Sequence, residues 1–365
     1  MKKDFFGSST ILITGGTGSW GNELTRQLLE KYNPKQIRIY SRGEQRQVEM
    51  KRRFQDDRIQ YYIGDVRDKD RLIMVMNGVD YVFHLAALKH VPVCEENPWE
   101  AVKTNIIGTQ NIIEVAIENK VKKVIDVSTD KAVDPFNLYG VTKACGEKLV
   151  IAANLIDDTK FVCIRGGNVM GTNGSVIPLF KEQLFRLNEI TITDEGMTRF
   201  LMRVEEAIEL VLNAAVNSVG GEVFVMRTPA CKIINLAKVL INKLGDKNSK
   251  IKHIGIRPGE KLFEVLVSKY EMPMTFEIDE YFVILPQIKI KRIEDFYKGK
   301  LNVRIGLEEF NSNNTHMLSQ KEIESLLERD GWFNLNYKNE ATNYLRSLNE
   351  KDLKRFFVSE GWVRK

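Results

Sequence analysis

The chain has 365 residues, enough for more than one domain, and its 43% hydrophobic and 28% charged residues are ordinary for a globular protein. Its 54 basic and 49 acidic side chains leave a formal net charge of +5, and we interpret the dense basic run Lys51-Arg52-Arg53 as the solvated face of a helix, so we expect no nucleic-acid partner. No stretch reaches the ~20 apolar residues that span a bilayer, and we expect a cytoplasmic protein without membrane insertion.

The first half of the chain alternates short apolar runs with amphipathic stretches, which predicts βαβ units and a Rossmann-like, doubly wound parallel sheet of the α/β class. Predicted strands are Ser9–Ile13, Gln36–Tyr40, Ile59–Ile63, Tyr81–His84, Lys123–Val127 and Phe161–Arg165. Predicted helices between them are Asn22–Lys31, Trp99–Asn119 and Tyr139–Leu155.

After about Val176 the rhythm loosens, and prolines punctuate shorter elements. We expect a Rossmann domain of residues 1–175, to which residues 200–228 return with a strand at Glu222–Met226. A smaller, discontinuous substrate domain would comprise residues 176–199 and 229–315. Residues 316–365 are predicted to form a helical extension, with a capping box at Ser319–Glu322 and a second helix start at Asn349–Asp352.

Cysteines and histidines give no sign of a disulfide framework or of a metal site. The cysteines at 94, 145, 163 and 231 are far apart in sequence and form no Cys-x-x-Cys pair, and the histidines at 84, 90, 253 and 316 are scattered. We therefore expect buried structural thiols and no metal.

Directly after the first strand, three glycines recur at Gly15-x-x-Gly18-x-x-Gly21. Glycine lets the backbone turn sharply and approach a pyrophosphate, and the following helix offers free N–H groups to that anion. The alternative is a tight turn without a ligand. The strand before and the helix after favour a dinucleotide site, with cofactor contacts from Thr14, Gly15, Thr17, Gly18, Ser19, Trp20 and Gly21.

The end of the second strand indicates which dinucleotide is bound. An NAD enzyme usually has a carboxylate there, whereas this chain has Ser41 and Arg42, followed by Gln45, which suit the 2′-phosphate of NADP. The alternative is a solvated loop. We predict NADP as the cofactor.

Further cofactor contacts are expected after the third and fourth strands. Asp65, with Val66 beside it, could accept a bond from the adenine amino group or could instead cap a helix. The small residues in Leu85-Ala86-Ala87 would leave room for a ribose, or would reflect close packing alone. Lys89 and Asn105 are further candidates for cofactor contacts.

The fifth strand leads into Tyr139-x-x-x-Lys143, in which the two side chains share one helix face. The Lys143 ammonium would lower the pKa of the Tyr139 hydroxyl and prepare it for proton abstraction. The spacing is common by chance, but its place after a glycine loop and a strand favours a catalytic pair.

With the glycine loop and this pair, the chain resembles the extended short-chain dehydrogenases/reductases. More narrowly, it resembles the inverting UDP-N-acetylglucosamine 4,6-dehydratases of pseudaminic acid synthesis, over nearly all residues before about 315. The segments that carry this resemblance are His84–Pro92, Ser128–Ala132, Asn137–Gly140, Gly167–Val169, Gly174–Pro178, Thr193-Asp194, Met197–Phe200 and Ile256–Lys261.

The resemblance implies a role for each residue of the reacting centre. Lys131 would remove the C5 proton, Asp130 would protonate the departing C6 oxygen, and Thr129 would hydrogen-bond near the C4 oxygen. These roles require Lys131 to lose a proton and Asp130 to keep one, so we expect burial to shift both pKa values toward neutrality. A surface salt bridge is the structural alternative.

The implied reaction oxidises C4, eliminates water across C5–C6 and returns the hydride to C6, with inversion at C5, giving UDP-2-acetamido-2,6-dideoxy-L-arabino-hex-4-ulose for bacterial surface glycans or nonulosonic acids. The resemblance also implies a homo-oligomer, from dimer to hexamer, and a UDP-sugar held mainly by the second domain. The candidate substrate contacts, each of which could be structural instead, are Lys89, Asn168, Ser175, Val176, Thr193, Arg199, Arg257 and Glu260.

Two positions depart from the family pattern: Gly166 replaces an expected aromatic residue, and Asn173 stands where arginine is common. These departures leave open a partial or retaining variant that releases or processes the 5,6-ene. A UDP-sugar 4-epimerase and a non-enzymatic NADP-binding scaffold are the rival hypotheses, and the presence of Asp130, Lys131, Tyr139 and Lys143 favours the dehydratase.

Overall fold

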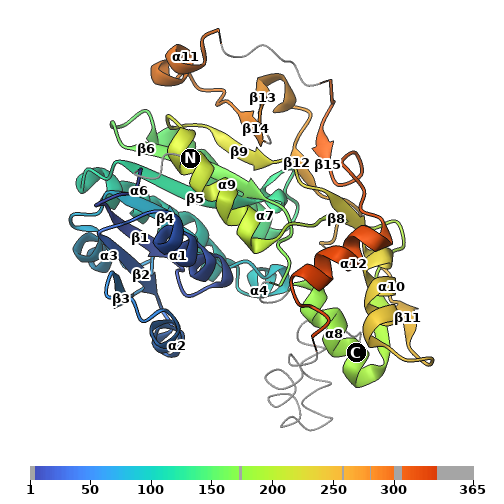
Figure 1. Cartoon of the computed structure of the whole chain (residues 1–365). Coiled ribbons are helices and arrows are strands. Elements are labelled where there is room, and N and C mark those ends of the chain that lie inside the picture. Colours follow the sequence, from blue (N-terminus) through green and yellow to red (C-terminus); the bar gives the residue numbers. More distant parts are fainter. Residues whose placement is uncertain (1–4, 172–174, 257–258, 280, 300–305, 335–365) are drawn as a thin grey trace.

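A nine-stranded sheet runs through the protein in a computed structural model, which describes all residues except 1–4, 172–174, 257–258, 280, 300–305 and 335–365 (Figure 1). Its strand order is β13-β14-β9-β6-β5-β4-β1-β2-β3. The strands are β1 (Thr10–Thr14), β2 (Gln36–Ser41), β3 (Ile59–Ile63), β4 (Tyr81–His84), β5 (Lys123–Thr129), β6 (Lys160–Gly166), β9 (Val223–Met226), β13 (Thr275–Ile278) and β14 (Tyr281–Ile284).

Strands β1–β6 and β9 pair in parallel, whereas β14 is antiparallel to β9 and β13 is antiparallel to β14. The order 3-2-1-4-5-6 confirms the predicted doubly wound, Rossmann-like sheet. Strand β1 has five residues, all of them buried, as expected for a parallel strand covered on both faces.

Helices cover both faces of this sheet. One face packs against α1 (Ser19–Lys31), α9 (Val204–Asn217) and α11 (Lys291–Tyr297), and α1 and α9 lie side by side in front of the strands in Figure 1. The other face packs against α3 (Lys69–Met76), α6 (Gly108–Glu118) and α7 (Leu138–Ala153). The basic run 51–53 is exposed on α2 (Glu44–Phe54), which confirms that it is a solvated helix face.

A second, smaller hydrophobic core gathers apolar side chains of the later chain. Its helices α8, α10 and α12 group together in Figure 1, apart from β1–β3. Ser319 and Glu322 form the predicted capping box at the start of α12. The elements of this region are α8 (Val176–Leu187), β7 (Glu189–Ile192), α10 (Ile233–Leu244), β11 (Lys250–His253) and α12 (Gln320–Arg329).

The predicted range 229–315 of the substrate domain needs a correction. Strands β13 and β14 fall in this range, but they extend the main sheet by pairing with each other and with β9. Helix α11 also falls in this range and packs on the main sheet. The apolar side chains of Phe282, Val283 and Ile293 are buried in these contacts. The division into domains otherwise stays a prediction, as does the helix start at 349–352, which lies outside the described residues.

Short elements complete the described part of the chain. They are α4 (Val91–Glu96), α5 (Pro98–Val102), the π-helix η1 (Lys103–Ile107), the 3-10 helices η2 (Asp130–Ala132) and η3 (Met272–Met274), β8 (Thr198–Phe200), β10 (Ala230–Lys232), β12 (Val265–Val267) and β15 (Phe310–Asn311).

The cysteine thiols are unpaired, and those of Cys94, Cys163 and Cys231 are buried. Across the described ranges, no cluster of His, Cys, Asp and Glu is arranged to hold a metal ion. None of the described helices combines the length and the apolar character that a bilayer crossing requires.

Candidate active site

The glycine loop forms a cradle between β1 and the start of α1. Gly15 has φ of +66°, and a Cβ atom there would lie 2.9 Å from the backbone nitrogen of Ala86, so only glycine lets the two loops approach each other so closely. Gly18 precedes α1 in an extended conformation and provides no side-chain cap. The first amides of α1 are therefore available to an anion, and the loop fits the pyrophosphate of a dinucleotide.

Trp20, at the beginning of α1, lies against Gly166 at the end of β6. A Cβ atom on Gly166 would be 3.2 Å from the Trp20 ring. The indole thus covers the position where sequence analysis expected an aromatic side chain, and an aromatic residue at 166 would displace it.

The residues predicted to contact the 2′-phosphate lie at the end of β2, in the turn that follows it and at the start of α2. Ser41 is half-buried and accepts a hydrogen bond from Gln47, whereas Arg42 and Gln45 are exposed. Gln45 donates to Glu49 on the same helix.

Asp65, after β3, forms an ion pair of 2.6 Å with Arg67. Burial raises the pKa of Asp65, but hydrogen bonds from Arg67 and the charge of Arg42 outweigh this effect, and the pKa is lowered. The alternative interpretation of Asp65 as a helix cap is wrong, because Asp68 caps α3 by accepting from the backbone N–H of Arg71.

The loop after β4 is held by Asn105 from the π-helix η1. The amide of Asn105 accepts from the backbone N–H of Leu88 at 2.8 Å, donates to its carbonyl at 2.9 Å, and donates to Thr142 on α7 at 3.0 Å. These bonds make Asn105 fix the loop, and its contact with the cofactor stays a prediction. Burial and the charge of Lys131 lower the pKa of Lys89, which places this loop beside the reacting centre.

All predicted catalytic residues come together where β5 runs into η2 and α7 begins. Asn137 caps α7, and a Cβ atom on Gly140 would lie 2.1 Å from the Lys131 carbonyl oxygen. Glycine at this position lets α7 start directly against η2. Tyr139 and Lys143 thereby face the end of β5, and Tyr139 hydrogen-bonds with Thr129.

Tyr139 and Lys143 are both buried, and their electrostatics differ from the prediction. Burial raises the pKa of Tyr139, and the opposing charges of Lys143 and Lys131 do not cancel this effect. The predicted lowering is therefore wrong for the protein alone, because desolvation dominates. Burial lowers the pKa of Lys143, but Asp126, 3.4 Å from its Nζ atom, reverses the shift and raises it.

Asp130 and Lys131 are neighbours in η2, with Lys131 Nζ 3.0 Å from Asp130 Oδ1. Asp130 is buried, whereas the Lys131 side chain is 27% exposed, so the pair is not a surface salt bridge. The predicted lowering of the Lys131 pKa is also wrong. Burial lowers it, but the charges of Asp130 and Glu264 dominate and raise it.

Sequence reasoning missed Asp126 and Glu264. Asp126 is a carboxylate within the otherwise apolar part of β5, which was an available signal. Glu264 precedes the apolar strand β12, and no local pattern links it to Lys131, whose Nζ atom lies 3.6 Å from its Oε1 atom. Burial raises the pKa of Glu264, and the nearby Lys131 charge opposes this.

Several buried polar atoms of this region have no hydrogen-bond partner among the described residues. Native proteins pair most buried polar groups, so such atoms mark places that a ligand completes. They include Asp126 Oδ1, Ser128 Oγ, Asp130 Oδ2, Asn168 Oδ1, Ser175 Oγ and Glu264 Oε2. Most belong to β5 or to the segments that follow β5 and β6, at the carboxyl edge of the sheet where doubly wound folds bind ligands.

Among the other predicted substrate residues, Arg199 is buried. Its guanidinium donates to the carbonyl oxygens of residues 198, 261 and 262, with Nε 3.5 Å from Glu264. These contacts fix the guanidinium in place, and its contact with the diphosphate stays a prediction.

The segment 259–264 approaches the reacting centre. Lys261 donates to the carbonyl oxygens of Val133 and Asp134, just after η2, and Glu260 beside it is half-buried. Thr193 contacts the sulfur of Met197, and Val176 begins α8. Arg257 and Asn173 lie outside the described residues.

The chain is similar to known proteins over most of its length. Residues 11–286 match the family model described as polysaccharide biosynthesis protein. The chain is 46% identical, over 87% of its length and 97% of the relative, to a UDP-N-acetylglucosamine 4,6-dehydratase (inverting) of Campylobacter jejuni. It is 43% identical, over 88% of its length and 96% of the relative, to a UDP-glucose 4-epimerase of Rickettsia canadensis. The structure of Pen from Bacillus thuringiensis matches with a TM-score of 0.83 and 38% identity, over 90% of this chain and 99% of that one.

Proposed function

Because the chain belongs to the polysaccharide biosynthesis protein family, among relatives of the extended short-chain dehydrogenase/reductase type, we propose that it is a hydro-lyase acting on UDP-N-acetylglucosamine. The reaction is an NADP-dependent 4,6-dehydration with inversion at C5. Its product is a UDP-4-keto-6-deoxy-N-acetylhexosamine for surface-glycan synthesis.

One observation carries this proposal: two acid–base units share one buried centre. Tyr139 with Lys143 is suited to the chemistry at C4, and Asp130 with Lys131 is suited to C5 and C6. A dehydratase needs both units, because it removes a carbon-bound proton and a hydroxyl group in addition to oxidising an alcohol.

Tyr139 takes the proton of the C4 hydroxyl, with the Lys143 ammonium and the Thr129 hydroxyl stabilising the phenolate. A nicotinamide dinucleotide held by the glycine loop would supply hydride acceptance at C4 and hydride return at C6. The resulting 4-ketone acidifies the C5 proton, which is what makes elimination accessible to an amine base.

The raised pKa of Lys131 is compatible with its role as that base. The ammonium and the Asp130 carboxylate share a hydrogen bond of 3.0 Å, and moving one proton across it gives an amine and a carboxylic acid. Lys131 then removes the C5 proton, and Asp130 protonates the C6 hydroxyl, which leaves as water. The pair regains its ionic form, so no outside proton donor is needed for elimination.

Proton NMR of the purified protein with UDP-N-acetylglucosamine and NADP in deuterated water tests the function. We expect a C6 methyl group, deuterium at C5 and the L-arabino configuration, together with a product mass lower by one water before isotope exchange. Retention at C5, or release of the 5,6-ene, would replace the inverting reaction by the partial or retaining variant. No change in mass would overturn the dehydration.

The choice of NADP rests on Ser41 and Arg42 at the end of β2, where no carboxylate would repel a 2′-phosphate. We expect Arg42→Ala to weaken NADP binding about tenfold or more and to leave NAD binding nearly unchanged. Calorimetric titration of both dinucleotides measures this. Equal loss for the two would remove Arg42 from the 2′-phosphate site, and Arg46→Ala, on the adjoining helix, is the control.

A 4-epimerase is the second candidate, because the Rickettsia canadensis relative carries that name. Epimerisation conserves mass, so the same incubation distinguishes it. Asp130 and Lys131 have no required part in epimerisation, and a Lys131→Ala variant that kept full turnover would favour it.

A further inference from the structure

Glu264 is a buried carboxylate whose capacity to accept hydrogen bonds is only partly used. Its side chain is 4% exposed, and its Oε1 atom lies 3.6 Å from Lys131 Nζ and 3.5 Å from Arg199 Nε. Its Oε2 atom is buried and has no partner within the described part of the chain. A carboxylate is seldom enclosed in this way unless its charge is used.

The fold fixes this carboxylate independently of the centre that it faces. The backbone N–H of Glu264 donates to Ser312 Oγ at 3.0 Å, and the Ser312 backbone N–H donates to the Glu264 carbonyl at 2.9 Å. Strand β12 then continues to Leu266, whose carbonyl accepts from Arg165. Glu264 therefore has little freedom to move away from Lys131.

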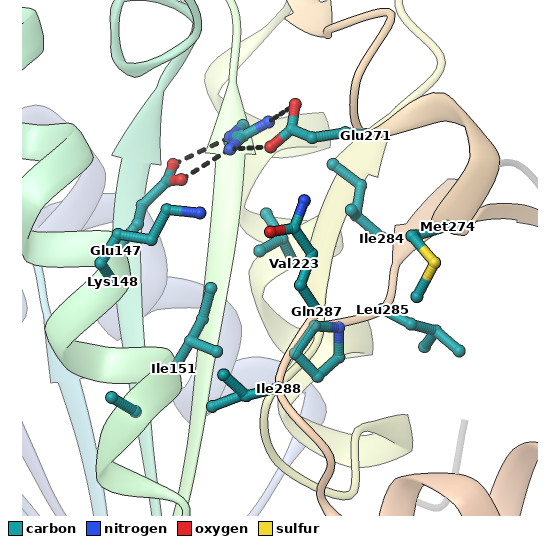
Figure 2. Close-up of a pocket in the computed structure, with 13 residues that line it drawn as sticks. Glu147, Lys148, Ile151, Val223, Glu271, Met274, Ile284, Leu285, Gln287 and Ile288 are labelled. Atoms are coloured by element: carbon teal, nitrogen blue, oxygen red, sulfur yellow. Dashed lines mark hydrogen bonds and ion pairs between the residues drawn. The ribbon is translucent and has the colours of Figure 1, made fainter.

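The far end of the same segment is anchored separately. Arg165 forms ion pairs with Glu147 on α7 at 2.6 Å and with Glu271 at 2.7 Å. Figure 2 shows Glu147 and Glu271 converging on this guanidinium from the two sides of a pocket. Glu271 in this anchor is a carboxylate, as Glu264 is. Among the described residues, however, Glu271 forms no ion pair with Lys131.

We propose that Glu264 is a positioning residue of the reacting centre, which holds the Lys131 ammonium together with Asp130 and sets the pH range in which this pair carries the single proton that its acid and base roles share. The inference rests on the proposed function, since it needs Lys131 to act as the base.

The charges around the two side chains determine the expected direction. Two carboxyl groups face one ammonium, and removal of either negative charge makes the neutral amine easier to form. Without the Glu264 charge, the positive charge of Arg199 would no longer be compensated. It would repel the Lys131 ammonium and thereby also favour the neutral amine. The titratable and charged groups that face Glu264 and Lys131 are Lys89, Asp130, Tyr139, Arg199 and Lys261.

The test is the pH dependence of C5 proton exchange and elimination, followed by single-turnover NMR with the full chain, NADP and UDP-N-acetylglucosamine. Glu264→Gln keeps the shape of the side chain and removes its charge. We expect the midpoint of the rising limb, at which the Asp130–Lys131 pair loses its second proton, to move to lower pH by about one unit or more. A midpoint equal to that of the parent protein, or at higher pH, overturns the proposal even if turnover falls.

Glu271→Gln is the matched control, because Glu271 is a carboxylate of the same segment that does not contact Lys131. We expect its midpoint to equal that of the parent protein, and a shift as large as that of Glu264→Gln would assign the effect to the segment as a whole. If Glu264→Gln does not fold, Glu264→Asp keeps the charge at a greater distance and should shift the midpoint in the same direction by less. Absence of dehydration by the parent protein would refute the proposed function, whereas dehydration with an unmoved midpoint would refute only the role of Glu264.

Discussion

Replacing Asp126 by asparagine should disable the lysine on which Tyr139 depends. Asp126 and Lys143 are 1% and 3% exposed, and the Asp126 Oδ2 atom lies 3.4 Å from Lys143 Nζ. Asparagine has nearly the same shape, so the change removes a charge and little packing. The buried ammonium then lacks the charge that reverses the effect of burial on its pKa.

The size of the effect follows from this distance of 3.4 Å. Two unit charges at that separation interact by about 1.2 kcal/mol in a water-like dielectric and by about 5 kcal/mol at an effective dielectric of about 20. At 1.36 kcal/mol per pKa unit, the pKa of Lys143 should fall by about 1 to 3.5 units. The raised pKa of Lys143 in the parent protein would therefore become a lowered one, because burial then dominates.

The assay is kcat/KM for the dehydration as a function of pH. In Asp126→Asn we expect kcat/KM to fall at a lower pH than in the parent protein, because neutral Lys143 no longer stabilises the Tyr139 phenolate. Asp56→Asn, which removes a carboxylate paired with Arg58 near β3, is the control and should keep the parental profile.

Stability gives an independent measurement of the same shift. In the parent protein the raised pKa of Lys143 stabilises the fold below about pH 10.4, and this contribution disappears as pH rises through the folded-state pKa. In the variant the folded-state pKa is depressed, so the free energy of unfolding should increase between that pKa and about pH 10.4. A kcat/KM profile equal to that of the parent protein, together with an equal stability profile, would refute the reasoning.

Three further predictions follow from particular contacts. Lys131→Ala should block elimination while C4 oxidation persists, so that reduced cofactor absorbance accumulates without loss of water; unchanged turnover would remove the mechanism. Gly140→Ala should lower kcat by about a hundredfold and the free energy of unfolding by about 1–3 kcal/mol, as measured by turnover and urea denaturation, because its Cβ atom would collide with the Lys131 carbonyl oxygen, and parental values would contradict this. Arg165→Met should cost about 3–5 kcal/mol in urea denaturation, because it leaves the Glu147 and Glu271 carboxylates enclosed without their cation, and a loss below about 1 kcal/mol would show that water reaches them.

Much of the fold was predictable because its signals are local. The apolar runs that form β1–β6 and the glycine loop lie within short windows of sequence, and the observed strands differ from the predicted ones by at most two residues at an end. The spacing of Tyr139 and Lys143 is likewise a helix periodicity. Strands β13 and β14 were assigned to the wrong region, since the pairing of β14 with β9 joins residues that are 55 to 61 positions apart, such as Tyr281 with Met226 and Ile284 with Val223.

The predicted catalytic residues were brought together, but the sequence alone did not indicate their partners. Asp126 and Glu264 were missed, and neither the backbone contacts that fix Arg199 nor the loop contacts of Asn105 were foreseen. The homo-oligomer and the helical extension after residue 334 stay predictions.

The sequence by itself determined which groups could do the chemistry, because residue type and spacing along a strand or helix are properties of the chain. The tertiary structure decided how those groups are charged. Lys131 is held as an ammonium because two carboxylates face it: Asp130, its neighbour in the chain, and Glu264, which is 133 positions away. Tyr139 resists ionisation because it is buried. Burial and Coulomb interactions depend on distances in space, and these exist only once the chain has folded.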